Sequence, residues 1–216
     1  MAGRSDSVRR NEPRSVQQQE SRAVNTPTHM LINWSLAKAL PVNAFPKSAV
    51  LIGSIAPDIP LYFLSIGGAM WFSWVEKMEP SQVGRHMFKN LFYNDPIWMS
   101  LHNVLHSPTV LIAALIAVLF IRGRKRVLES WWTWFFGSCL LHTLVDIPVH
   151  HDDGPLVFWP LNWSYRYASP VSYWDRNHYA AITIPLEIAL VFALTARLIW
   201  DRFRTGPQQD GGTATD

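Results

Sequence analysis

The chain has 216 residues, and charged residues make up only 16% of it, against about 25% in an average soluble domain. Hydrophobic residues reach 49%, with 11 Trp, 11 Phe and 6 Tyr, which excludes a disordered chain and a coiled coil and favours contact with a membrane. The net charge of +3 comes from separate basic clusters, so no nucleic acid is expected as a partner. Cys139 is the only cysteine, which excludes an intramolecular disulfide and a thiolate metal site.

The first predicted element is a disordered N-terminal tail at 1–28. It holds five Arg, three acidic residues and three consecutive Gln, and too little apolar surface to offset the entropy of ordering. Residues 205–216 are rich in Gly, Thr, Gln and Asp and predict a second disordered tail. Between the tails, residues 29–204 are expected to form one helical membrane domain that carries a metal site.

Four stretches almost free of formal charge follow in chain order, at 48–75, 96–121, 130–149 and 177–196. Crossing ~30 Å of hydrocarbon takes about 20 helical residues. Because no run shows clean period-two alternation, the predicted fold class is all-α, a membrane-embedded bundle of about four transmembrane or membrane-associated helices. The prolines inside the first two stretches leave fewer true crossings as an alternative.

Basic residues orient these stretches, because Lys and Arg beside a span favour the cytoplasmic side. Lys38 and Lys47 precede the first stretch, 122–126 separates the second from the third, and Arg202 and Arg204 follow the fourth. Four crossings with both termini in the cytoplasm satisfy all three clusters.

Three of the four stretches contain a single acidic residue: Asp58, Asp146 and Glu187. A charge at bilayer depth costs at least ~2.5 kcal/mol, so each should face a partner, water or a metal ion. Asp58 can alternatively cap a helix that begins at Ile59. For Glu187, an interhelical hydrogen bond and a proton site both remain open.

Two pairs of candidate ligands have i,i+4 spacing: His102 with His106, and His142 with Asp146. On a helix this spacing puts both side chains on one face, where they can converge on one ion. His150 continues the second face by one turn. Imidazole and carboxylate ligands suit a divalent metal, in the first place Zn, with Mn or Fe(II) as alternatives. The competing interpretations are an intrahelical ion pair and two hydrogen-bonded core histidines.

These segments resemble the family of membrane-bound, metal-dependent hydrolases that includes bacterial inner-membrane proteins of the YdjM type. The resemblance rests on Thr28-His29, on the run from Gly53 to Pro60, on the run from His102 to Pro108, and on the run from His142 to Asp146 followed by Trp159-Pro160. The order of ligands also resembles, more distantly, the all-helical zinc-dependent phospholipase C enzymes. The resemblance implies a hydrolase of the bacterial inner (plasma) membrane.

The resemblance implies metal ligands at His29, Asp58, His106, His142 and Asp146; the spacing adds His102 and His150. The predicted reaction is metal-assisted hydrolysis of an ester or phosphoester, with Asp152 or Asp58 as proton acceptor. A small-molecule or lipid substrate and membrane lipid are the expected partners, and the oligomeric state stays open. The alternatives are a proton or metal-ion transporter and a non-catalytic membrane adaptor. The predicted topology puts His29 at the cytoplasmic edge, so either His29 is no ligand or some stretches do not cross.

Overall fold

The computed structural model describes residues 25–42 and 45–204. Within these ranges the chain is helical and contains no strand, only an isolated bridge between Leu156 and Arg166, which confirms the predicted all-α class. The first helix begins at Asn25, so the last four residues of the tail expected at 1–28 are helical instead. The remainder of both predicted tails lies outside the described residues.

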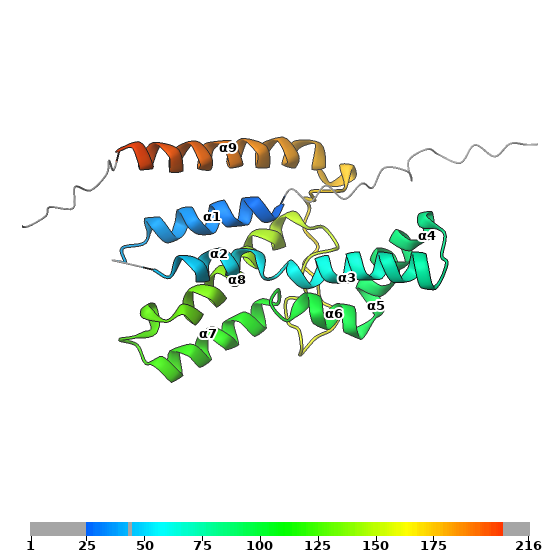
Figure 1. Ribbon diagram of the computed structural model, residues 1–216, viewed down its shortest axis with the longest axis horizontal. Coiled ribbons are helices and arrows are strands. Elements are labelled where there is room, and N and C mark those ends of the chain that lie inside the picture. The colour runs from blue at the N-terminus through cyan, green and yellow to red at the C-terminus, as the bar shows by residue number, and fades with distance from the viewer. Residues whose placement is uncertain (1–24, 43–44, 205–216) are drawn as a thin grey trace, which may run out of the picture.

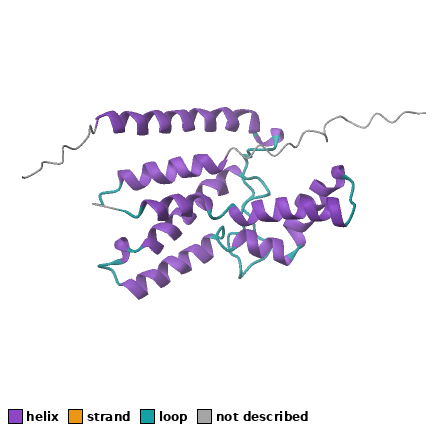
Figure 2. Ribbon diagram, viewed as in Figure 1, coloured by secondary structure: helices purple, strands orange, loops and turns teal. Residues whose placement is uncertain are grey.

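The helices form two groups that meet near the middle of the molecule (Figure 1). One group contains α1 (Asn25–Ala39), α2 (Lys47–Ile55), α7 (Pro108–Arg122), α8 (Trp131–Asp146) and α9 (Ala180–Arg204). The other contains α3 (Ile59–Met70), α4 (Pro80–Arg85), α5 (Phe92–Asn94) and α6 (Pro96–Asn103), with π-helical segments at Trp71–Val75 and His86–Leu91. A mostly irregular segment, 150–179, joins α8 to α9 and is drawn as loop in Figure 2.

Two of the expected spans are broken helices. The α2 axis and the axis of Ile59–Val75 differ by 42°, and those of α6 and α7 by 47°. Proline explains both breaks, because it lacks the N–H that would continue the helix and it begins helices well. Pro60 stands in the first turn of α3, and Pro108 begins α7. Each break leaves a short turn in which polar side chains can leave the helical register.

Among the described residues, α9 is the one helix that is long and apolar enough to cross a membrane by itself. Each broken pair meets the same test if the pair counts as one span, which gives one to three candidate spans. α8 has 16 residues, about 24 Å at 1.5 Å per residue and therefore short of the ~30 Å hydrocarbon layer. The expected four crossings are therefore replaced by one to three, because the stretch at 130–149 forms this shorter helix.

α2 and α8 pack closely against each other in the core. A Cβ added at Gly53 would lie 2.4 Å from the Phe135 carbonyl oxygen and 2.9 Å from Ser138 Cβ. Both atoms belong to α8, and one of them is backbone, so rotation of a side chain cannot relieve the overlap. Gly53 thus allows the approach that brings Ser54 and Asp58 to α8.

Gly53→Ala is expected to destabilise the protein by ~1–3 kcal/mol, because the extra methyl group pushes two helices apart. Thermal unfolding of the purified chain in detergent measures this effect. Gly137→Ala on α8 is the matched control, since a Cβ there meets nothing within 4 Å and helix propensity alone predicts a gain of up to ~1 kcal/mol. Equal melting temperatures for the two variants would contradict the close approach.

Candidate metal centre

Four helix ends or breaks meet in the middle of the molecule, and each carries candidate ligands. They are the first turns of α1 with His29, the α2–α3 break with Asp58, the α6–α7 break with His106, and the last turn of α8 with His142 and Asp146. α1 runs away from this point (Figure 1). His29 therefore lies at the same level as the other candidate ligands. The predicted topology places His29 at the cytoplasmic edge, far from them, and this separation is not found.

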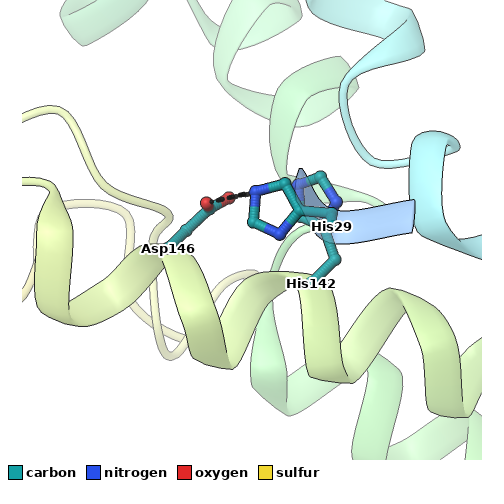
Figure 3. A group of neighbouring side chains, drawn as sticks. All are labelled: His29, His142 and Asp146. Atoms are coloured by element: carbon teal, nitrogen blue, oxygen red, sulfur yellow. Dashed lines mark ion pairs between the residues drawn. The ribbon is translucent and has the colours of Figure 1, made fainter. Parts of the chain in front are cut away.

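The Asp146 carboxylate is the centre of the cluster. Its Oδ2 lies 2.8 Å from His106 Nε2 and 3.1 Å from His142 Nε2. Its Oδ1 lies 2.9 Å from His29 Nε2, and the His29 and His142 rings stack at 3.8 Å with the carboxylate at their edge (Figure 3). All four side chains are buried. A buried carboxylate is stable only when a positive charge or several donors compensate it.

His142 shows why a cation fits here. Its Nδ1 lies 2.7 Å from the Ser54 carbonyl oxygen, and because a carbonyl only accepts, Nδ1 must carry the proton. In the neutral ring Nε2 then holds a lone pair, which lies 3.1 Å from Asp146 Oδ2 and 3.4 Å from Asp58 Oδ1. Among the described residues, neither this Nε2 nor Asp146 Oδ1 has a partner in hydrogen-bond geometry. A lone pair between two carboxylates repels both unless a proton or metal ion lies between them.

The ligand atoms are close enough to share an ion. Two groups of three have all their donor atoms within 4.8 Å of one another: His29 with His142 and Asp146, and Asp58 with His106 and His142. Imidazole nitrogen and carboxylate oxygen in this number suit Zn²⁺, and also Mn²⁺ or Fe²⁺. The residues therefore fit a divalent metal ion.

Asp58 does not act as a helix cap, because its side chain makes no capping hydrogen bond to α3. Instead, Thr26 Oγ1 donates to Asp58 Oδ2 at 2.7 Å, and Thr26 Oγ1 also lies 2.7 Å from the Tyr62 hydroxyl. This leaves Asp58 Oδ1 directed toward His142. Sequence reasoning missed Thr26; its position three residues before His29 was the available signal.

Further hydrogen bonds fix α1, which carries His29. Thr28 Oγ1 donates to Glu187 Oε1 on α9 at 2.6 Å, so Glu187 is an interhelical hydrogen-bond acceptor. Asn33 Nδ2 donates to Ser54 Oγ at 2.8 Å. Such outer partners hold metal ligands in orientation and often matter nearly as much as the ligands.

Three predicted site residues lie at the edge of the cluster or outside it. His102 is buried beside His106, with ring centroids 4.8 Å apart, but belongs to neither group of three. His150 directs Nε2 toward Asp146 Oδ1 at 3.8 Å, while its Nδ1 lies 3.0 Å from Asp153. Burial lowers the pKa of His150, and the carboxylates of Asp153 and Asp146 raise it more, so the net shift is upward. Asp152 is exposed and lines a neighbouring cavity.

A protein-family model with the description "YdjM inner membrane protein" matches residues 25–206. The chain belongs to this family. No curated protein and no solved structure matches the chain. The YdjM match confirms the family resemblance predicted from the sequence and, together with α9, identifies an inner membrane protein. It covers every candidate ligand from His29 to His150.

Proposed function

We propose that this YdjM family protein is a membrane-bound, metal-dependent hydrolase that acts on an ester or phosphoester. The observation that carries the proposal is His142, whose Nδ1 donates to Ser54 and whose Nε2 faces two carboxylates. A divalent ion, with Zn²⁺ as the first choice, would supply Lewis-acid activation of water and of the bond that is attacked. His29, His106, His142 and Asp146 would hold it.

The proton acceptor is Asp58 in this proposal. The Asp58 side chain is 20% exposed, whereas that of Asp146 is 5% exposed, so of the two carboxylates Asp58 is the more accessible to water. The hydrogen bond from Thr26 holds one oxygen and leaves the other facing the cluster. Asp152, the other predicted proton acceptor, lines the adjoining cavity instead.

Asp58→Asn is expected to lower kcat by about 100-fold or more, the usual contribution of a positioned proton acceptor. Asp152→Asn is the comparison and should stay within about 10-fold of the wild-type rate, because Asp152 lines the neighbouring cavity and not the cluster. Asp201→Asn, at a residue of α9 with an exposed side chain, is the control and should keep the wild-type rate. The substrates are bis(p-nitrophenyl) phosphate, p-nitrophenyl phosphate and p-nitrophenyl acetate, with the zinc-loaded full chain in detergent. Elemental analysis of both variants separates lost chemistry from lost metal. The reverse order of effects would assign the role of proton acceptor to Asp152. Absence of hydrolysis by the zinc-loaded wild-type protein would overturn the proposed hydrolase function.

We also propose an orientation in the membrane. The end of α1, the start of α2, the α7–α8 connection and the end of α9 lie at one end of the helix group (Figure 1). They carry Lys38, Lys47, 122–126, Arg202 and Arg204. The positive-inside rule makes this end cytoplasmic, and the metal centre then lies at the opposite end. The proposal therefore puts the end of α9 on the cytoplasmic side and the start of α1, beside the metal centre, on the opposite side.

Transport of protons or metal ions is the second candidate function. It is favoured by the two broken spans, because transporters place ion sites where helices are interrupted. Here Asp58 and His106 lie in the two breaks. Zinc flux into proteoliposomes that is lost in Asp58→Asn, without hydrolysis in the detergent assay, would select this function.

A further inference from the structure

A second polar feature is a cavity of about 360 Å³ between α5 and the irregular segment 150–179. The side chains that matter for its chemistry are Tyr93, His151, Asp152, Trp163 and Arg166. None of the five belongs to the groups that can hold the metal ion.

A row of packed side chains lies between the cavity and the metal centre. The Arg166 guanidinium lies 4.8 Å from the Phe92 ring centroid. The Phe92 ring lies 5.0 Å from the His102 ring, and the His102 ring 4.8 Å from that of His106. His151 on the cavity wall directly follows His150, which faces Asp146. A molecule that fills the cavity is thus within a few side chains of the candidate ligands.

Arg166 is the unusual residue of this cavity. Its Nη1 donates to the Gly154 carbonyl oxygen, and its guanidinium lies over the rings of Phe92 and Tyr93. Its Nη2 is buried and has no hydrogen-bond partner among the described residues. No carboxylate of the described residues lies within ion-pair distance of the Arg166 guanidinium.

A guanidinium group in this position favours an anionic ligand. Burial lowers the pKa of Arg166, yet an arginine stays charged at neutral pH. The two aromatic faces compensate part of the desolvation through cation–π contacts. Asp152 and Asp153 act on the guanidinium only from beyond ion-pair distance, so no carboxylate forms a direct ion pair with it. The Nη2 group, which has no partner among the described residues, can donate a hydrogen bond to an oxyanion, and guanidinium binds phosphate oxygens with matching geometry.

We propose that this cavity binds a phosphate group of the substrate, with Arg166 as the recognition residue, so that the substrate of the metal centre is an ester that carries a phosphate group. The inference rests on the hydrolase function proposed above. Two side chains beside Arg166 suit such an ester. Burial, together with the charges of Asp152 and Asp153, raises the pKa of Tyr93 to about 12, so its hydroxyl keeps a proton to donate. Trp163 offers an aromatic wall to the alcohol part of the ester.

Binding of phenyl phosphate to the full chain in detergent tests the proposal. Titration calorimetry is carried out with zinc-loaded and with EDTA-treated protein. Arg166→Gln is expected to weaken binding by about 10–100-fold in both states, in line with the loss of a charged hydrogen bond. Arg166→Lys should recover part of the affinity, because lysine restores the charge without the planar fork. Arg176→Gln, at an exposed arginine of the same segment, is the control and should bind as wild type does.

Benzoate and inorganic phosphate define the ligand class. Phenyl phosphate and phosphate should both depend on Arg166, whereas benzoate should bind more weakly. Equal affinity of Arg166→Gln and wild type for phenyl phosphate, or equal affinity of wild type for benzoate and phenyl phosphate, would overturn the inference. Because these readouts measure binding with and without metal, they are separate from the hydrolysis and metal-content assays that test the hydrolase.

A further variant keeps the test valid if Arg166→Gln does not fold. Trp163→Ala removes an exposed wall and leaves Arg166 in place. This variant should bind phenyl phosphate more weakly but inorganic phosphate as wild type does. Unchanged affinity for phenyl phosphate would count against the site.

The source of the ester follows from competition in nanodiscs of phosphatidylcholine with and without phosphatidic acid. Displacement of phenyl phosphate by phosphatidic acid identifies a lipid phosphate, and its absence identifies a soluble ester; either result supports the shared phosphate chemistry.

Discussion

Asp146→Asn is expected to abolish metal binding, with an affinity loss of more than about 100-fold, since even outer partners of metal ligands are worth 10–100-fold. The asparagine side chain keeps the shape and removes the negative charge that three imidazoles face at 2.8–3.1 Å. Any hydrolysis should disappear with the metal. Elemental analysis of purified protein, followed by zinc titration with a competing chelator, measures the loss.

Asp201→Asn is the control for the Asp146 experiment. Asp201 lies on α9 and is paired with Arg197 at 4.0 Å, where both side chains are exposed; such a surface pair contributes little. This variant should bind metal as wild type does. Wild-type metal content in Asp146→Asn would show that the cluster is a hydrogen-bonded core and not a metal centre. If Asp146→Asn fails to fold, His106→Gln removes one ligand and leaves the carboxylate in place.

Removing the metal is expected to cost stability as well as activity. A ligand at about 1,000 times its Kd stabilises a folded protein by about 4 kcal/mol. Treatment of the zinc-loaded wild type with EDTA should therefore lower its melting temperature by roughly 10 °C. Without the metal ion, the His142 Nε2 lone pair again repels the two carboxylates, and this repulsion contributes to the loss of stability. Differential scanning fluorimetry in detergent measures the shift.

The Asp146→Asn variant provides the comparison for this measurement. Its melting temperature should not respond to EDTA, because it holds no metal to lose, and zinc added back should restore only the wild type. An unchanged wild-type melting temperature after complete metal removal would mean that the cluster carries its own compensating protons. That result would contradict a structural contribution from the metal.

The i,i+4 spacing describes the local structure of one pair of candidate ligands but not of the other. His142 and Asp146 share a face of α8, as i,i+4 spacing requires. α6, however, ends at Asn103, and the chain turns at 104–106 before Pro108. His106 therefore leaves the helix, and a tertiary contact with Asp146 brings it into the cluster. Local periodicity contains no information about such a contact.

The part of the fold that could not be predicted is the direction of α1. Residues 25–39 are too polar to stand out as an apolar stretch, so the four predicted stretches do not include α1. One extra helix reverses the position of His29 relative to the other ligands. The hydrogen bonds from Thr26 and Asn33, which decide how α1 sits, join residues 21 and 32 positions apart and leave no pattern in the sequence. Arg166 lies between two tyrosines in the sequence, and no motif around it indicates a binding site.

The hydrogen bond between Thr28 and Glu187 joins α9 to the helix that carries His29. α9 is the most lipid-suited helix of the described chain, and little of it is buried by the rest of the protein. Helices of this kind change tilt when bilayer thickness changes. Glu187 is hydrogen-bonded to the residue directly before His29, so a tilting motion is transmitted to that imidazole within one peptide unit. Bilayers of different acyl-chain length should accordingly bring out different zinc affinities from one and the same polypeptide.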